Sequence, residues 1–133
     1  MPQKLMPDNP KDYRYLESHE WHKKEADGTI AIGVTQHAAE ELDQVTFVGL
    51  PKVGAKIAKG QSWGIIESHK ASNDLYSGVS GAVTAVNEEL SKSPEIVNAD
   101  PFGRGWMIKI KPDNPAEFEQ LLSAEDYQKT IAH

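Results

Sequence analysis

Residues 64–81 read GIIESHKASNDLYSGVSG, and this stretch predicts a β-hairpin that displays one lysine. An apolar run leads from Gly64 into a short polar turn, with Lys70 near the tip, and a second extended run ends at Gly81. No genetically encoded side chain can serve as a long swinging arm. A protein that needs such an arm attaches it covalently, and an exposed lysine is the usual anchor. Taken alone, however, a turn lysine is more often an ordinary solvated residue.

The composition excludes several classes of function. The chain has 133 residues and no cysteine, which excludes disulfides, thiolate metal sites and a cysteine nucleophile. The formal net charge is −6 and no cluster of lysine or arginine appears, so nucleic-acid binding is not expected. No stretch approaches a membrane span or a secretory signal, and a cytoplasmic location is expected. The acidic balance fits a partner with a positive patch, or a charge that only keeps the protein soluble.

Short β-rich runs separated by turns dominate the chain. Residues 1–12 contain three prolines and no periodic pattern, so they are expected to form a flexible leader before one domain over residues 13–133. Strands are predicted at residues 13–15, 20–24, 29–34, 45–48, 62–67, 74–77, 82–86 and 106–111. The chain is therefore predicted to form a mostly β (α+β) domain, a small barrel or sandwich.

The predicted helices are short and lie mostly at the end of the chain. Thr35 is placed to cap a helix over residues 36–42, and Pro94 is placed as the first residue of another. After Pro112 a helix is expected from Asn114, with its apolar face formed by Phe118, Leu121 and Leu122. Ser123 is expected to cap a last helix, and the terminal helices to cover one open face of the sheet.

Several stretches in one order carry a resemblance to a known family. They are Ser18–Trp21, Thr29–Thr35, His37–Ala38, Phe47–Pro51, Glu67–Ala71, Pro94–Asn98 and Gly105–Ile110. Together they resemble the H protein of the glycine cleavage system, a lipoyl carrier, from Tyr13 to about Tyr127. The resemblance implies a barrel-sandwich hybrid fold of the lipoyl type, with lipoate attached to Lys70. Biotin carriers present a similar lysine between methionines, whereas the neighbours here are His69 and Ala71.

The resemblance also implies a cleft that receives the loaded arm. Ser18, Glu20 and Asp74 match the positions whose polar groups hold the amine of the cargo, and a carboxylate suits an ammonium in a partly desolvated cleft. Each of the three also has an ordinary explanation. Ser18 would be a turn residue, Glu20 a charge on the surface of a strand and Asp74 a residue at the end of the hairpin. The motif around the arm is formed by Glu67, Ser68, His69, Ala71 and Asn73.

The chain departs from the family's usual pattern near the arm. His69 stands where valine is usual, Asn73 follows Ala71-Ser72 where the family has Ser, and Gly78 stands where proline is usual. Histidine is the side chain whose ordinary chemistry involves protons near neutral pH, so His69 would either favour thiolate chemistry on the arm or be a neutral turn residue. The other histidines show no convincing ligand spacing, so neither a metal site nor a catalytic residue is expected.

Two carrier functions fit these residues. In the first, a monomeric, non-enzymatic carrier is lipoylated by a lipoate-attaching enzyme and ferries an aminomethyl group. Its partners are then glycine decarboxylase, aminomethyltransferase and dihydrolipoyl dehydrogenase. In the second, an H-like lipoate-binding protein carries sulfur for a heterodisulfide-reductase-like oxidation complex, which the altered residues at His69–Asn73 would suit. An unlipoylated docking module is a third alternative, and fold alone does not separate the three.

Overall fold

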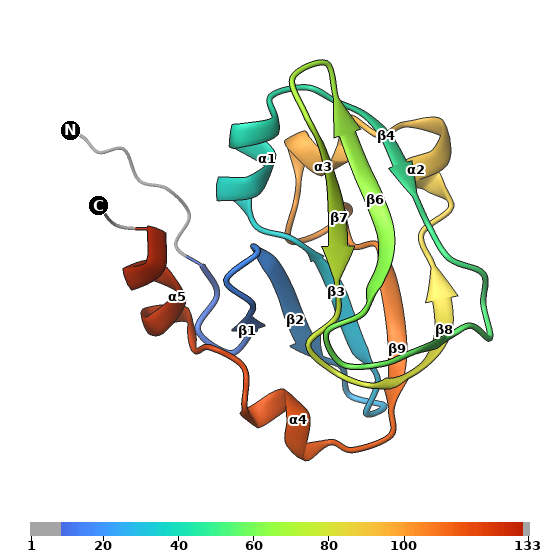
Figure 1. Cartoon of the computed structure of the whole chain (residues 1–133), viewed down its shortest axis with the longest axis vertical. Helices are drawn as coiled ribbons and strands as arrows, with labels where there is room; N and C mark the ends of the chain where they lie inside the picture. Colours follow the sequence, from blue (N-terminus) through green and yellow to red (C-terminus); the bar gives the residue numbers. More distant parts are fainter. Residues whose placement is uncertain (1–8, 132–133) are drawn as a thin grey trace.

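The computed structural model describes residues 9–131, and its strands form two antiparallel sheets (Figure 1). The six-stranded sheet has the order β1-β2-β3-β9-β8-β5, and the three-stranded sheet has the order β4-β6-β7. The strands of the larger sheet are β1 Arg14–Tyr15, β2 Glu20–Lys24, β3 Ile30–Val34, β5 Lys56–Ile57, β8 Gly81–Val86 and β9 Ile108–Pro112. Those of the smaller sheet are β4 Val45–Gly49, β6 Ser62–Ser68 and β7 Ser72–Tyr76. The predicted mostly β barrel-sandwich fold is confirmed.

The main core lies between the two sheets. It joins Ile32 and Ile110 of the larger sheet to Val48, Ile66 and Leu75 of the smaller one, and all five side chains are buried. A second apolar cluster occupies the outer face of β2 and β3 and contains Tyr15, Trp21, Ala31, Ala124 and Tyr127. Because both of its faces are covered, β3 is buried along its whole length. Burial on both faces explains why its sequence is apolar throughout rather than alternating.

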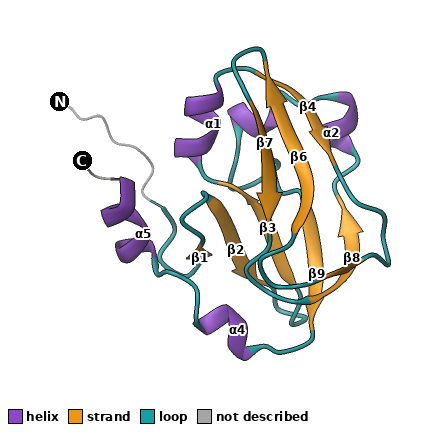
Figure 2. Cartoon of the chain, in the orientation of Figure 1, coloured by secondary structure: helices purple, strands orange, loops and turns teal. Residues whose placement is uncertain are grey.

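Within residues 9–131, five short helices lie at the periphery of the sheets (Figure 2). They are α1 Gln36–Leu42, α2 Glu89–Lys92, α3 Ile96–Ala99, α4 Ala116–Glu119 and α5 Ala124–Ile131. Thr35 caps α1 as predicted, since its hydroxyl accepts from the Ala38 N–H at 3.3 Å. Ser123 caps α5 in the same way, accepting from the Asp126 N–H at 3.1 Å. No helix within residues 9–131 is both long enough and apolar enough to cross a membrane.

The two terminal helices differ from the prediction. Only α5 covers the outer face of the sheet, where Tyr15 and Tyr127 stack with ring centroids 4.9 Å apart. The helix at α4 ends at Glu119, so Leu121 and Leu122 do not extend its apolar face. Leu122 instead exchanges two backbone hydrogen bonds of 2.9 Å with Tyr15, which holds the chain extended there. This long-range pairing overrides the helical spacing of the leucines.

Other element boundaries shift by a few residues. The helix predicted from Pro94 begins at Ile96, because the carbonyls of Ser93 and Pro94 first accept turn-type hydrogen bonds from residues three positions ahead. The strand predicted at residues 106–111 is found at Ile108–Pro112. The expected leader falls mostly on residues 1–8, and the domain end on residues 132–133; both lie outside the described residues. At the described edge, Asn9 donates to the Gln128 side chain at 3.0 Å.

Candidate functional site

Lys70 lies exposed on the turn that joins β6 to β7, at the top of Figure 1. The turn closes with a hydrogen bond of 2.8 Å from the Ser68 N–H to the Ala71 carbonyl. The Ser68 hydroxyl also accepts from the backbone N–H groups of Lys70 and Ala71, at 3.1 and 3.2 Å. Ser68 therefore fixes the backbone on both sides of the lysine, as serine commonly does in tight turns.

The hairpin below this turn is anchored on three sides. Strand β6 pairs with β7 on one edge and with β4 on the other, so it is the central strand of its sheet. Ile66 and Leu75 are buried in the main core, 1% and 2% exposed. The Glu67 carbonyl accepts from the Thr46 hydroxyl of β4 at 3.2 Å. A flexible lysine side chain is thus displayed from a rigid support.

A cleft of about 730 Å³ lies beside the hairpin. One wall is the hairpin from Lys70 to Tyr76, and the other walls are the loop before β2 and one side of α1. Its apolar surface includes the side chains of Val34, Leu42, Ile66 and Leu75. Its polar surface includes Ser18, His19, Glu41, Asn73 and Asp74. The mixture suits a long group with a hydrocarbon stem and a polar end.

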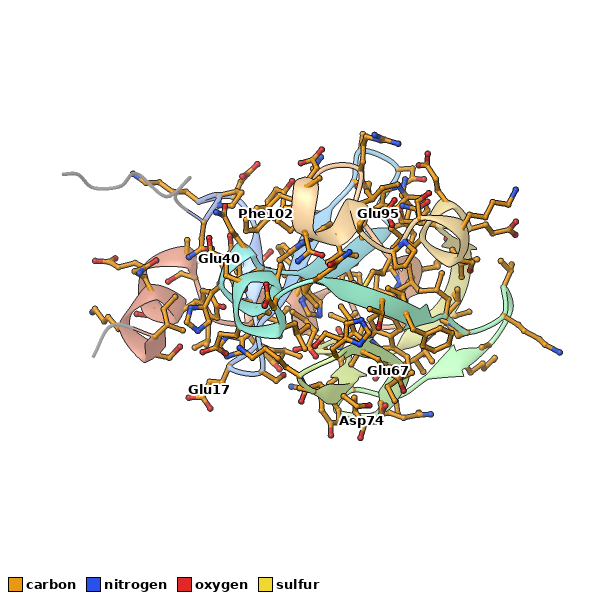
Figure 3. The ribbon with its side chains drawn as sticks, turned by 90° about the horizontal axis from the view of Figure 1, so that it is seen from above. Glu17, Glu40, Glu67, Asp74, Glu95 and Phe102 are labelled. Atoms are coloured by element: carbon orange, nitrogen blue, oxygen red, sulfur yellow. The ribbon has the colours of Figure 1, made fainter. Side chains whose placement is uncertain are left out.

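The three residues predicted for the arm cleft occupy different depths. Ser18 and Asp74 line the cleft and are exposed, whereas Glu20 is not a lining residue and is only 1% exposed. In Figure 3 the Asp74 side chain lies on the outer side of the hairpin. Within residues 9–131 its carboxylate has no hydrogen bond or ion pair. Asp74 is therefore available to a group that enters the cleft.

Glu20 lies behind Ser18 and connects two sheets. Its carboxylate accepts from the Ser18 hydroxyl at 2.5 Å and from the Tyr76 N–H of β7 at 2.8 Å. Burial raises the pKa of Glu20 to about 7, and its two hydrogen bonds oppose this rise. Near neutral pH the Glu20 carboxyl group consequently exists in both protonation states. The charge behind the cleft wall therefore changes with pH in this range.

The remaining motif residues divide between the cleft and the solvent. Ala71 and Asn73 line the cleft, but Glu67, Ser68 and His69 do not. His69 is exposed next to Lys70. The Glu67 carboxylate is reached by the Ser72 hydroxyl at 3.5 Å across the strand pair. The side chains of His69 and Glu67 therefore lie outside the lining of the cleft.

Two cleft residues, His19 and Glu41, were not predicted. His19 occupies a turn before β2 with φ of 81°, and its Nδ1 lies 2.7 Å from the Tyr127 hydroxyl. Glu41 belongs to helix α1, and no short-range sequence pattern links it to His19. Only contacts between distant segments bring them together, and no sequence spacing signals that.

The comparisons with known proteins agree with this geometry. The family model described as Glycine cleavage H-protein matches residues 13–133. A glycine cleavage system H protein of Saccharophagus degradans is 51% identical over 120 residues, covering 90% of this chain and 92% of the relative. One of Neisseria meningitidis serogroup C is 49% identical over 118 residues, covering 89% and 92%. A crystal structure of the H protein of Mycobacterium marinum matches with a TM-score of 0.82 at 34% identity, covering 91% of this chain and 97% of that one.

Proposed function

The chain belongs to the glycine cleavage H-protein family, whose members are lipoyl carriers, and from this premise we propose that Lys70 is its lipoylation site. The observation that carries the proposal is the placement of Lys70 on the exposed turn of an anchored hairpin. Its neutral Nζ amine would attack the carboxyl carbon of an activated lipoyl group, the bond to the activating group would break as that group leaves, and the nitrogen would lose a proton. The amide that forms carries no charge. When attached, the lipoyl group supplies the redox-active dithiolane on which an aminomethyl group is carried.

The cleft beside the hairpin fits the arm that Lys70 would bear. Val34, Leu42, Ile66 and Leu75 offer an apolar wall for a hydrocarbon stem. Ser18 and Asp74 offer a hydroxyl and a carboxylate for an ammonium at its end, and both lie in the same cleft as Lys70. Glu20 contributes negative charge from behind Ser18 when it is ionised. These residues would hold the cargo amine by hydrogen bonds and charge until a partner withdraws the arm.

The cargo and the partners follow from the family. The relatives bear the name of the glycine cleavage system, which favours an aminomethyl cargo over the sulfur-carrying alternative. The partners are then a lipoate-attaching enzyme, the glycine decarboxylase that loads the arm, the aminomethyltransferase that unloads it and the dihydrolipoyl dehydrogenase that reoxidises it. All of these would meet the face that displays Lys70 and His69, both of them exposed.

The intact mass of the protein from lipoate-replete cells tests the assignment of Lys70. The expected result is one lipoyl group per chain, mapped to the peptide that contains Lys70, and no modification of Lys70→Arg. Because Lys70 is exposed, Lys70→Arg should change the free energy of unfolding by no more than about 0.5 kcal/mol. A wild-type chain left unmodified, or a lipoyl group at another lysine, would overturn the proposal.

A further inference from the structure

Three side chains with metal-binding donors meet at the wall of the cleft. They are His19 from the turn before β2 and His37 and Glu41 from α1, and one donor atom of each lies within 4.8 Å of the others. The imidazole rings of His19 and His37 have centroids 4.8 Å apart at a tilt of 45°. His19 and Glu41 also line the cleft. Two imidazoles and one carboxylate are a common ligand set of zinc sites that keep one coordination position open.

The pair on α1 already has the spacing that a bound ion requires. His37 Nε2 lies 3.2 Å from Glu41 Oε2, and the two residues are one helical turn apart. Ligand bonds of about 2.0–2.2 Å in a tetrahedral zinc site place neighbouring donor atoms about 3.3 Å apart. The third donor, on His19, lies no more than 4.8 Å from these two. His37 and Glu41 are partly exposed, with side chains 33% and 64% accessible, so both are free to move closer to it.

His19 is oriented toward α1 by contacts that do not involve the other two ligands. Its backbone has φ of 81°, which is uncommon for a residue other than glycine, and is held by hydrogen bonds to Leu16 and Thr35 of 3.0 and 2.9 Å. Its Nδ1 lies 2.7 Å from the Tyr127 hydroxyl, and that hydroxyl lies 2.7 Å from Thr35 Oγ1. When Nδ1–H donates to Tyr127, the lone pair of Nε2 is left for an ion. Zinc-binding histidines are supported in this way by a partner on the second ring nitrogen.

The electrostatics favour neutral imidazole over imidazolium at His19. Burial, followed by the neighbouring His37, lowers the pKa of His19, while Glu41 raises it less. A metal ion needs a deprotonated imidazole, so this environment reduces the proton competition that weakens histidine sites near neutral pH. Burial also raises the pKa of Tyr127 to about 12, so its hydroxyl keeps its proton. The carboxylate of Glu41 supplies the negative charge that a divalent cation needs.

We propose that His19, His37 and Glu41 bind one divalent transition-metal ion of the zinc class in the wall of the arm cleft. Imidazole donors select zinc and its neighbours over magnesium and calcium, which prefer oxygen ligands alone. The fourth position is left to water or to a group inside the cleft. The site uses only unmodified side chains, so it does not depend on whether Lys70 carries an arm.

Titration of the tag-free Lys70→Arg chain with Zn²⁺, against a chromogenic chelator, tests the proposal. We expect one ion per chain, and at least a tenfold weaker binding in His37→Gln and in Glu41→Gln, since even the loss of a supporting contact weakens metal sites about 10–100-fold. Co²⁺ in place of Zn²⁺ should give the visible absorption of a four-coordinate site. The matched controls are His69→Gln, an exposed histidine on the hairpin, and Glu40→Gln, the neighbour of Glu41 on α1. Both should bind Zn²⁺ as the parent does.

Two results would overturn the proposal. One is the absence of stoichiometric binding in the parent chain. The other is an equal weakening by the ligand and control variants, which would indicate nonspecific association with surface groups. Circular dichroism of His37→Gln and Glu41→Gln distinguishes loss of a ligand from loss of α1. Because the binding assay uses the arm-free chain, its failure leaves the lipoylation of Lys70 untouched.

Discussion

The backbone N–H of Gly78 donates a hydrogen bond of 3.0 Å to Nε2 of His22, and both residues are buried. Burial lowers the pKa of His22 to about 3, so the ring is neutral and its Nε2 accepts. A Cβ at position 78 would lie 2.4 Å from Leu121 Cδ2 and 3.3 Å from His22 Nε2. Glycine at position 78 therefore supplies the N–H that His22 accepts and leaves free the space that a Cβ would fill.

Gly78→Pro should destabilise the protein more than Gly78→Ala does. Both add a Cβ against Leu121, but only proline removes the N–H and leaves His22 Nε2 without its donor. A buried polar atom left unsatisfied costs about 1–3 kcal/mol, which is the difference expected between the two variants in chemical denaturation. In a His22→Val background the difference in stability between the two variants should shrink, because no buried acceptor remains that could lose its donor. A difference of the same size there would point to backbone strain from proline instead.

Glu20 should make the stability of the protein fall as the pH rises from about 4.5 to 7. Its folded-state pKa of about 7 lies above its ordinary value of 4.5, so within this window the folded chain retains a proton that the unfolded chain has lost. Glu20→Gln preserves the shape and keeps an acceptor for the Tyr76 N–H. Relative to wild type, the variant should gain stability across the window, by up to about 3 kcal/mol at pH 8.

Comparison with wild type at each pH is needed because His22 has the opposite effect. Its depressed pKa makes the unfolded chain bind the extra proton between about pH 3 and 6.5, so its contribution to stability rises with pH there. The contribution of His22 to the free energy of unfolding is the same in Glu20→Gln and wild type, so it cancels in their difference. The control is Glu25→Gln, a partly exposed glutamate just after β2. A difference that stays flat with pH would mean that Glu20 is ionised throughout.

His69→Val should alter the function of the turn without altering the fold. The His69 side chain is exposed and does not line the cleft, so the free energy of unfolding should change by less than about 0.5 kcal/mol. A rate change should appear instead in aminomethyl transfer with the purified partners, because this residue lies beside the attachment point. Unchanged rates with every partner would reduce His69 to a turn residue.

The parts of the site that local pattern encodes were predictable, and the parts that depend on long-range contacts were not. The hairpin around Lys70 follows from an apolar run that leads into a polar turn, and the structure has strands on both sides of it. The burial of Glu20 depends on Ser18 and on Tyr76, which is 56 residues away. The meeting of His19 with Glu41 depends on a positive φ and on Tyr127, 108 residues away. Sequence spacing carries no information about such contacts.

Ser68→Ala should slow lipoylation of Lys70 much more than it destabilises the protein. The Ser68 hydroxyl accepts from the N–H groups of Lys70 and Ala71, so its loss frees the backbone on which the lysine is presented. These groups are solvent-exposed and can turn to water, so the free energy of unfolding should fall by only about 0.5–1 kcal/mol. A ligase that recognises a fixed turn must then order it on binding, which lowers the rate of modification.

The measurement is the initial rate of lipoylation of arm-free protein by the purified lipoate-attaching enzyme, followed by intact mass. Ser72→Ala is the matched control, because Ser72 is an exposed serine on the other side of the turn and makes only a 3.5 Å contact with Glu67. The control should be modified at the wild-type rate. If Ser68→Ala is modified as fast as the Ser72→Ala control, the β-strands alone hold the turn. A rate lowered equally in both variants would instead indicate that the ligase reads serine hydroxyls along the hairpin rather than the shape of the turn.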